Sequence, residues 1–201
     1  MISSFLWGAE SSPDSPYSVA TTVEQSLLCG KVDRGENWFY HNNIGYSGKN
    51  ISLFAGKQQG DWKPVWGGHK KSVPDEKAIF KLTVDHGKNV RNGSYEYAIY
   101  PDIKLRDMPE AANSYQVLAN DEKVQAVKLK NGVLMAIFHK RGRIADFATD
   151  SAGAFIITED KIFAADPTQK KRIFNLTLNK KAYKITLPSG AFTGQTVATA
   201  R

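Results

Sequence analysis

A hairpin signature near residue 131 restricts the fold of this chain more than any other short stretch. Alternating runs at 124–130 and 133–139 flank Asn131-Gly132, and Asn-Gly between two such runs favours a tight antiparallel turn. Similar short runs recur along the chain, separated by turn residues, and no stretch shows helical periodicity over more than two turns. The sequence therefore predicts an all-β protein built from antiparallel sheets.

The expected strands can be placed from the alternation. In the first half they are predicted at 5–8, 17–28, 38–41, 44–46, 51–54, 78–84 and 95–100. A charged turn is expected at 30–36, a long irregular segment at 56–72 and a turn-rich loop at 85–93. In the second half strands are predicted at 115–119, 124–130, 133–139, 142–148, 153–158, 161–165, 171–178 and 183–187.

Charge divides the chain at the segment 103–113, which contains Pro109 and is predicted to be a linker. Residues 1–110 hold 13 basic and 13 acidic side chains, whereas residues 111–201 hold 14 basic and 7 acidic ones and so carry the whole net charge of +7. The sequence predicts two domains, 1–110 and 111–201, and an anionic partner for the second. Nucleic acid is not expected, because no recognition motif presents the basic residues.

Composition excludes several other classes of protein. The single cysteine, Cys29, rules out an internal disulfide framework and a cysteine-based zinc site. No apolar run approaches the ~20 residues that cross a membrane, and the first residues lack the basic start of a signal peptide. The four histidines are not at metal-ligand spacing, so a zinc site is not expected. No other metal or cofactor is predicted.

The densest aromatic stretch, 36–46, leaves two interpretations open: a site or a sheet core. It contains Trp38, Phe39, Tyr40 and His41 and ends in Asn42-Asn43-Ile44-Gly45-Tyr46. For His41, and for His86 beside Asp85, the expected role is a hydrogen-bonded side chain that fixes a loop. Acyl-transfer and nucleotide-binding motifs do not occur.

Two groups of residues are candidates for carbohydrate binding. Trp62 and Trp66 precede His69-Lys70-Lys71, and indole rings can lie against sugar faces while ammonium groups neutralise sulfate or carboxylate. The alternative is that both rings cap the open edge of a sandwich. Arg141 and Arg143 flank a second turn, where guanidinium groups either bind anions or are simply solvated.

Several motifs follow one another in the order found in a known family. They are Phe5-Leu6-Trp7-Gly8, Ala20-Thr21-Thr22-Val23-Glu24-Gln25, Trp38 to Tyr46, Gly60-Asp61-Trp62-Lys63-Pro64-Val65, Asp85-His86-Gly87, Tyr95 to Pro101 and Ala165-Asp166-Pro167-Thr168-Gln169. Together they resemble the C-terminal portion of polysaccharide lyase family 8, which includes chondroitin, hyaluronate and xanthan lyases. The sequence that begins at His41 resembles the chondroitin ABC lyase branch most.

The resemblance implies a specific architecture and role. Residues 1–110 would form the end of an antiparallel super-sandwich, and 111–201 a small C-terminal antiparallel β-sandwich. The family's catalytic residues would lie upstream, so none is assigned here and the chain alone is expected to be inactive. The longer enzyme of which this chain would be a portion, its parent enzyme, would be secreted or periplasmic. It would cleave chondroitin sulfate or hyaluronan by β-elimination.

Two further expectations accompany this interpretation. Strands without partners would expose sheet edges that favour self-association. The alternative function is a free-standing β-sandwich module that binds acidic polysaccharide, with no role for a membrane.

Overall fold

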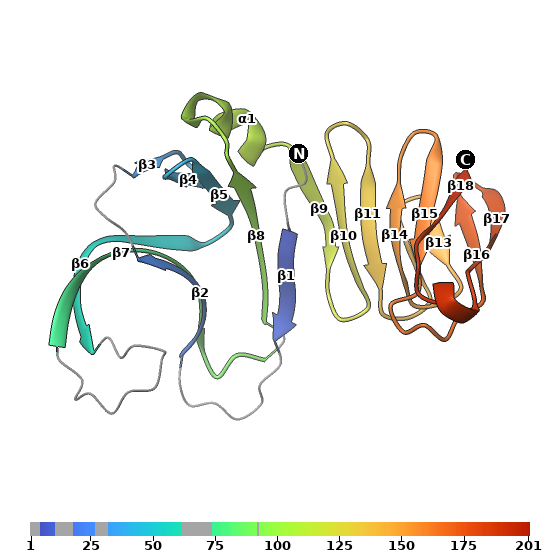
Figure 1. The fold of residues 1–201 in the computed structure, drawn as a ribbon, viewed down its shortest axis with the longest axis horizontal. Coiled ribbons are helices and arrows are strands. Elements are labelled where there is room, and N and C mark those ends of the chain that lie inside the picture. Colours follow the sequence, from blue (N-terminus) through green and yellow to red (C-terminus); the bar gives the residue numbers. More distant parts are fainter. Residues whose placement is uncertain (1–4, 11–17, 27–31, 62–73, 92) are drawn as a thin grey trace. The chain divides into compact units, whose positions relative to one another are not determined.

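The computed structural model describes residues 5–10, 18–26, 32–61, 74–91 and 93–201, which belong to two compact units. The N-terminal unit is Met1–Ala112 and the C-terminal unit is Asn113–Arg201. Antiparallel strands dominate both units (Figure 1), which confirms the predicted all-β class. In the described ranges, no helix has the length and apolar character needed to cross a membrane.

The N-terminal unit contains a five-stranded and a three-stranded sheet. The five-stranded sheet has the order β1 (Phe5–Glu10), β8 (Gly93–Pro101), β5 (Ile44–Gly48), β4 (Trp38–His41) and β3 (Asp33–Arg34). The three-stranded sheet has the order β2 (Ser18–Ser26), β7 (Pro74–Lys88) and β6 (Ile51–Asp61). The strands β6 and β7 form a long curved hairpin (Figure 1).

The core of this unit lies where the two sheets supply apolar side chains. Tyr46, Phe80 and Leu82 are buried, and Phe80 is fully enclosed. Half-buried Phe39 and Ile99 pack against them from neighbouring strands of the five-stranded sheet. The aromatic stretch of the sequence is therefore part of a sheet core, and Asn42 and Asn43, with φ of 47° and 60°, form the two-residue turn between β4 and β5.

The segment predicted to be a linker is instead packed against the N-terminal unit. It contains a 3₁₀ turn, η1 (Leu105–Asp107), and a short helix, α1 (Met108–Ala112), which contacts β4 and β5. Met108 is fully buried, and a Cβ added at Gly45 would overlap its sulfur atom. The linker interpretation is wrong because a glycine on β5 opens the space that the methionine occupies.

Strand pairing also extends two strands beyond their predicted ends. The irregular segment expected from residue 56 begins later, because β6 continues to Asp61 opposite Pro74 in an unbroken ladder with β7. The loop expected from residue 85 begins after Lys88, because β7 pairs with β2 through a bulge. Gly87 accommodates the distortion with a φ of 79° and donates its N–H to Asp85 Oδ1 at 2.8 Å.

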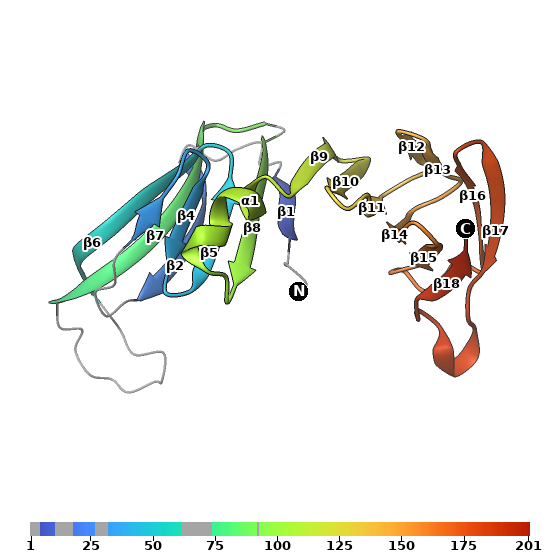
Figure 2. The ribbon, with the colours of Figure 1, turned by 90° about the horizontal axis from the view of Figure 1, so that it is seen from above.

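The C-terminal unit is a sandwich of a six-stranded and a four-stranded sheet. The six-stranded sheet has the order β18 (Val197–Ala200), β15 (Lys161–Ala165), β14 (Gly153–Ile157), β11 (Leu134–Phe138), β10 (Val124–Leu129) and β9 (Tyr115–Asn120). The four-stranded sheet has the order β12 (Gly142–Ile144), β13 (Phe147–Thr149), β16 (Ile173–Leu178) and β17 (Lys181–Thr186). Figure 2 shows the two layers facing each other within this unit.

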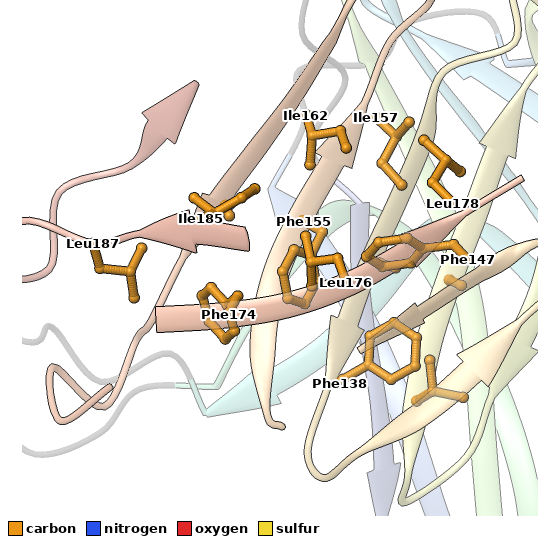
Figure 3. Packing of buried hydrophobic residues seen from close by; sticks show 14 residues of the cluster. Phe138, Phe147, Phe155, Ile157, Ile162, Phe174, Leu176, Leu178, Ile185 and Leu187 are labelled. Carbon is orange, nitrogen blue, oxygen red and sulfur yellow. The ribbon is translucent and has the colours of Figure 1, made fainter. Parts of the chain in front are cut away.

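Four phenylalanines hold the two layers of this sandwich together (Figure 3). Phe155 of the six-stranded sheet meets Phe147 and Phe174 of the four-stranded sheet edge to face, with ring centroids 5.1 and 5.0 Å apart. Phe138 packs edge to face on Phe147 and Phe155. Such ring pairs add about 0.5–1.5 kcal/mol each beyond their buried area, so this cluster stabilises the contact between the two sheets.

Turns in the C-terminal unit match the predictions in part. The Asn131-Gly132 hairpin joins β10 to β11, with Gly132 at a φ of 87° and its N–H bonded to the carbonyl of Leu129. The single strand expected at 142–148 is wrong, because Ala145 has a φ of 47° and the chain turns back to form β12 and β13. The last strand, β18, and the 3₁₀ turn η2 (Gly190–Phe192) were not predicted.

Candidate functional site

His41 is a core side chain and not a reactive one. Its ring is fully buried and stacks on Phe80, with the ring centroids 5.0 Å apart. Among the described residues, neither of its ring nitrogens has a hydrogen-bond partner, so the predicted hydrogen-bonded role is wrong. Burial lowers the pKa of His41, because the imidazolium ion would lose its hydration.

His86 also lies on a strand instead of in a loop. Its half-buried ring is tilted against Tyr95, with centroids 5.9 Å apart, and Tyr95 stacks in turn on Tyr97. The side chain therefore continues an aromatic row on β8. Like His41, it helps to pack the sheets of the N-terminal unit.

The first predicted carbohydrate-binding group cannot be placed. Trp62, Trp66, His69, Lys70 and Lys71 all lie outside the described residues. The sugar-contact and edge-capping interpretations of the two indole rings both stay predictions.

The second predicted group lies in the fully described C-terminal unit. Arg141 is exposed in the turn that leads into β12, and Arg143 is exposed on β12 itself. Arg143 pairs with Ala148, which pairs with Thr177 and then with Ala182 across the four-stranded sheet. This row lies on the outer face, because the neighbouring row contains the buried Phe147 and Leu178.

A cation on the same outer face was not selected from the sequence. Lys184 on β17 is exposed and lies between half-buried Tyr183 and buried Ile185, and it pairs with Asn175 on β16. The alternation of these three residues in the sequence is a signal that could have identified Lys184. Arg143 and Lys184 therefore stand on the two edge strands of one sheet, on its outer face.

Acidic side chains of the C-terminal unit are used in local hydrogen bonds. The buried Asp166 accepts hydrogen bonds from the backbone N–H groups of Thr168, Lys170 and Lys171, at 2.9, 2.8 and 2.6 Å, and from the Thr168 hydroxyl at 2.7 Å. Burial acts to raise the pKa of Asp166, but these hydrogen bonds outweigh it and hold the pKa below its ordinary value.

Asp150 forms a second such centre. It accepts hydrogen bonds from Asn175 Nδ2 at 2.7 Å and from the Ser151 hydroxyl at 3.0 Å, and the Lys171 ammonium lies 3.5 Å away. Partial burial acts to raise the pKa of Asp150, and these partners together lower it below its usual range. The two carboxylates fix the loops around 150 and 166–171 and leave little acceptor capacity for other cations.

The described residues contain no cluster of three or more side chains of the types that ligate metals. The candidate binding groups among the described residues are therefore the exposed cations of the C-terminal β-sandwich.

Comparison with protein families identifies both units. The model of the polysaccharide lyase family 8 super-sandwich domain matches residues 6–112, and the model of the family's C-terminal beta-sandwich domain matches residues 116–173. Chondroitinase-AC of Pedobacter heparinus is 30% identical over an alignment 231 positions long, which covers 94% of this chain and 32% of that protein.

Solved structures agree with this assignment. A chondroitinase AC lyase studied in complexes with oligosaccharides superposes with a TM-score of 0.75 at 26% identity, covering 97% of this chain and 34% of that one. The chondroitin AC lyase of Streptomyces coelicolor gives a TM-score of 0.72 at 19% identity over 86% of this chain and 25% of that one. A Paenibacillus xanthan lyase gives 0.56 at 19% identity over 90% of this chain and 20% of that one, and these last two show the fold alone.

The chain thus spans about a third of the length of the Chondroitinase-AC that it matches. The relatives named above are chondroitin AC and xanthan lyases, and the finer assignment to the chondroitin ABC lyase branch stays a prediction. Two domain models of one family match the chain in succession, the first over residues 6–112 of 201. The chain belongs to polysaccharide lyase family 8.

Proposed function

We propose that this chain is the non-catalytic β-sandwich portion of a lyase that cleaves an acidic glycosaminoglycan of the chondroitin or hyaluronan type by β-elimination. The observation that carries the proposal is the match to Chondroitinase-AC over 94% of this chain, with super-sandwich and C-terminal domains in the same order. Because the substrate is a long polymer, the enzyme would act outside the cytoplasm, secreted or in the periplasm.

The chemistry explains why the role proposed for this portion is that of a scaffold. β-Elimination at a uronic acid needs a base for the C5 proton, an acid for the leaving oxygen and polar groups that neutralise the carboxylate. Enclosed in the core, His41 cannot reach a polymer, and His86 packs against Tyr95. The catalytic groups would come from other parts of the enzyme, which these sandwiches support.

Two assays test the proposal. The 201-residue chain is incubated with chondroitin sulfate and with hyaluronan while the absorbance of unsaturated uronate is followed, and no rise is expected. The longest polypeptide that the gene locus encodes in frame with this chain is assayed in the same way and is expected to give unsaturated products. Activity of the chain alone, or inactivity of the longer polypeptide on both substrates, would overturn the proposal.

A second candidate is a carbohydrate-binding module that acts without any lyase. The excess of seven basic residues in the C-terminal unit favours it, since exposed cations attract sulfated chains. This candidate predicts salt-sensitive affinity of the chain for chondroitin sulfate, lost when Trp62 and Trp66, or Arg141 and Arg143, are changed to alanine. It also predicts that the longer polypeptide has no lyase activity, which separates the two candidates.

A further inference from the structure

Charged side chains are sorted by position in the C-terminal unit. All of its acidic residues lie in turns or loops, whereas the charged residues on its strands are all basic. The acidic residues are Asp121, Glu122, Asp146, Asp150, Glu159, Asp160 and Asp166; the basic residues on strands are Lys128, Arg143, Lys161, Lys181 and Lys184. In the strand ladders of this unit, no carboxylate therefore stands opposite one of these cations, and Asp150, just after β13, is bonded to Asn175 of β16.

Few of the lysine and arginine side chains in this unit form an ion pair with a carboxylate. In the C-terminal unit, all of which the structure describes, two ion pairs are found: Lys171 with Asp150 at 3.5 Å and Lys161 with Asp160 at 3.9 Å. The other acidic centre, Asp166, is occupied by hydrogen bonds from its own loop. Arg143 and Lys184 are exposed, and within this unit no carboxylate lies within 4.0 Å of either.

The surface between these two cations carries short side chains and one carboxylate, Asp150, which is bonded to Asn175 and paired with Lys171. Ala148, Thr177 and Ala182 continue the row of Arg143, and Asn175 stands beside Lys184 in the adjacent outer row. Arg143 and Lys184 stand three strand spacings apart across the sheet, or about 14 Å. A flexible anionic chain that crosses the strands would meet a cation at each edge and the Thr177 hydroxyl between them, and the nearby Asp150 carboxylate is countered by Lys171.

We propose that this outer face of the four-stranded sheet binds a segment of acidic polysaccharide, held by Arg143 at one edge and Lys184 at the other. The inference rests on the proposed function for the class of ligand, and it adds a surface that the lyase reaction itself does not require. A guanidinium fork suits sulfate and carboxylate groups, and an ammonium ion provides a point charge. The outer face between the cations carries no aromatic ring for base stacking, which favours polysaccharide over single-stranded nucleic acid.

Cations on edge strands also discourage edge-to-edge pairing of sheets. If Arg143 and Lys184 act in that way, substituting them changes the oligomeric state. If they bind polysaccharide, substituting them lowers the affinity. The experiment must therefore measure both quantities.

The test uses the full 201-residue chain and chondroitin sulfate oligosaccharides of defined length, with calorimetric titration at two salt concentrations. The variant is Arg143→Gln/Lys184→Gln, which keeps much of each side-chain stem. The matched control is Lys128→Gln/Lys161→Gln, which removes the same charge from strands of the other sheet. Thermal melting confirms that the variants fold, and sedimentation gives the oligomeric state.

The variant is expected to bind at least about 10-fold more weakly, because two charge-assisted contacts are lost. The slope of log affinity against log salt should also fall by roughly one to two. The control should stay within about two-fold of the unchanged protein, since it lacks only long-range charge, which salt screens. Hyaluronan in place of chondroitin sulfate separates carboxylate from sulfate recognition.

Four outcomes overturn the inference: unchanged affinity in the variant, an equal loss in the control, a change in oligomeric state without a change in affinity, or tighter binding of DNA that polysaccharide does not displace. The proposed function is judged separately by unsaturated products from the longer polypeptide. Binding lost in the variant supports this inference even if that lyase assay fails, and the lyase assay can succeed even if the variant binds normally.

Discussion

The two units enclose cores of different chemistry. The core of the C-terminal sandwich is built on four phenylalanine rings packed edge to face. The N-terminal unit instead buries an imidazole, His41, and a hydrogen-bonded hydroxyl pair, Ser47 and Tyr100, whose oxygens lie 2.9 Å apart. The difference teaches that two sandwiches of one chain can respond to pH over different ranges, because the N-terminal unit buries an imidazole, His41, and the C-terminal unit buries a carboxylate, Asp166.

The sequence provides a convenient way to observe the units separately. All four tryptophans, at positions 7, 38, 62 and 66, belong to the N-terminal unit. Tryptophan fluorescence therefore follows the N-terminal unit, and a calorimetric or circular-dichroism transition without a fluorescence change follows the C-terminal one. The four predictions below use these signals.

The largest expected effect tests whether aromatic packing dominates the C-terminal core. Phe155 contacts the other three rings, so Phe155→Ala should lower the free energy of unfolding of this unit by about 3–5 kcal/mol. Denaturant unfolding should show the loss in the transition that tryptophan does not report. The exposed Phe192→Ala is the control and should change little; a loss below about 1 kcal/mol at Phe155 would contradict the comparison.

The next prediction concerns the one buried charge of the C-terminal unit. Asp166→Asn should cost about 2–3 kcal/mol, because an amide nitrogen cannot accept the N–H groups that the carboxylate accepts. The lowered pKa of Asp166 means that its stabilisation is complete at neutral pH and is lost as the pH falls below about 4. Denaturation at pH 7 and pH 3 checks both points.

In the variant, the dependence of the C-terminal transition on acid should become weaker. Asp160→Asn is the control, since that carboxylate is exposed and its hydrogen-bond partner is the nearby Thr158 hydroxyl. Equal effects of the two substitutions would show that burial of the carboxylate is not what matters.

Close packing in the N-terminal unit can be tested at Gly45. Gly45→Ala should destabilise the unit by about 1–3 kcal/mol, because the new Cβ would overlap Met108 Sδ and come within 3.1 Å of Ile103 Cγ2. Tryptophan-detected unfolding measures the loss. The double variant Gly45→Ala/Met108→Ala should lose less stability than the sum of the losses in the two single variants. A loss equal to that sum would show that the two residues do not compete for one space.

The smallest effect tests whether protonation sets the stability of the N-terminal unit. Because burial lowers the pKa of His41, the unfolded chain takes up a proton at a higher pH than the folded state does. The contribution to stability is therefore fully present well above pH 6.5 and should decrease as the pH is lowered from 7.5 to 5.5. The fluorescence transition at both pH values measures this.

His41→Phe should remove the dependence on pH, since phenylalanine can keep the stacking on Phe80 without a titratable group. His86→Phe is the matched control and should leave the pH dependence in place. If both variants behave like the unchanged protein, the buried imidazole does not distinguish the two cores.

Much of the fold was predictable because alternation and turn chemistry are local. The β4–β5 turn at Asn42-Asn43 and the β10–β11 hairpin follow directly from residues that tolerate positive φ. The extension of β6 to Asp61 was not predictable, since Gly56 to Gly60 has poor strand propensity and is ordered by its partner β7. The packing of α1 depends on a cavity above Gly45 that is formed by a strand some sixty residues earlier.

The candidate site was predictable only in part for the same reason. Arg143 was chosen from its place beside a turn, which is a local property. The selection of Lys184 and Asn175 requires the order of β12, β13, β16 and β17 in the sheet, and that order is set by long-range pairing. His86 was given a loop role because β7 continues farther than local propensity indicates, whereas the burial of His41 against Phe80 depends on a strand distant in the sequence.

The packing of Met108 against Gly45 also restricts how the sequence can evolve at these two positions. A side chain at position 45 and a long side chain at position 108 exclude each other, so a substitution at one site is tolerated only after a smaller residue has appeared at the other. Aligned relatives should therefore show these two positions varying together, with glycine opposite the bulky residue. The short helix, through this one contact, restricts which mutational paths are open to the sheet beneath it.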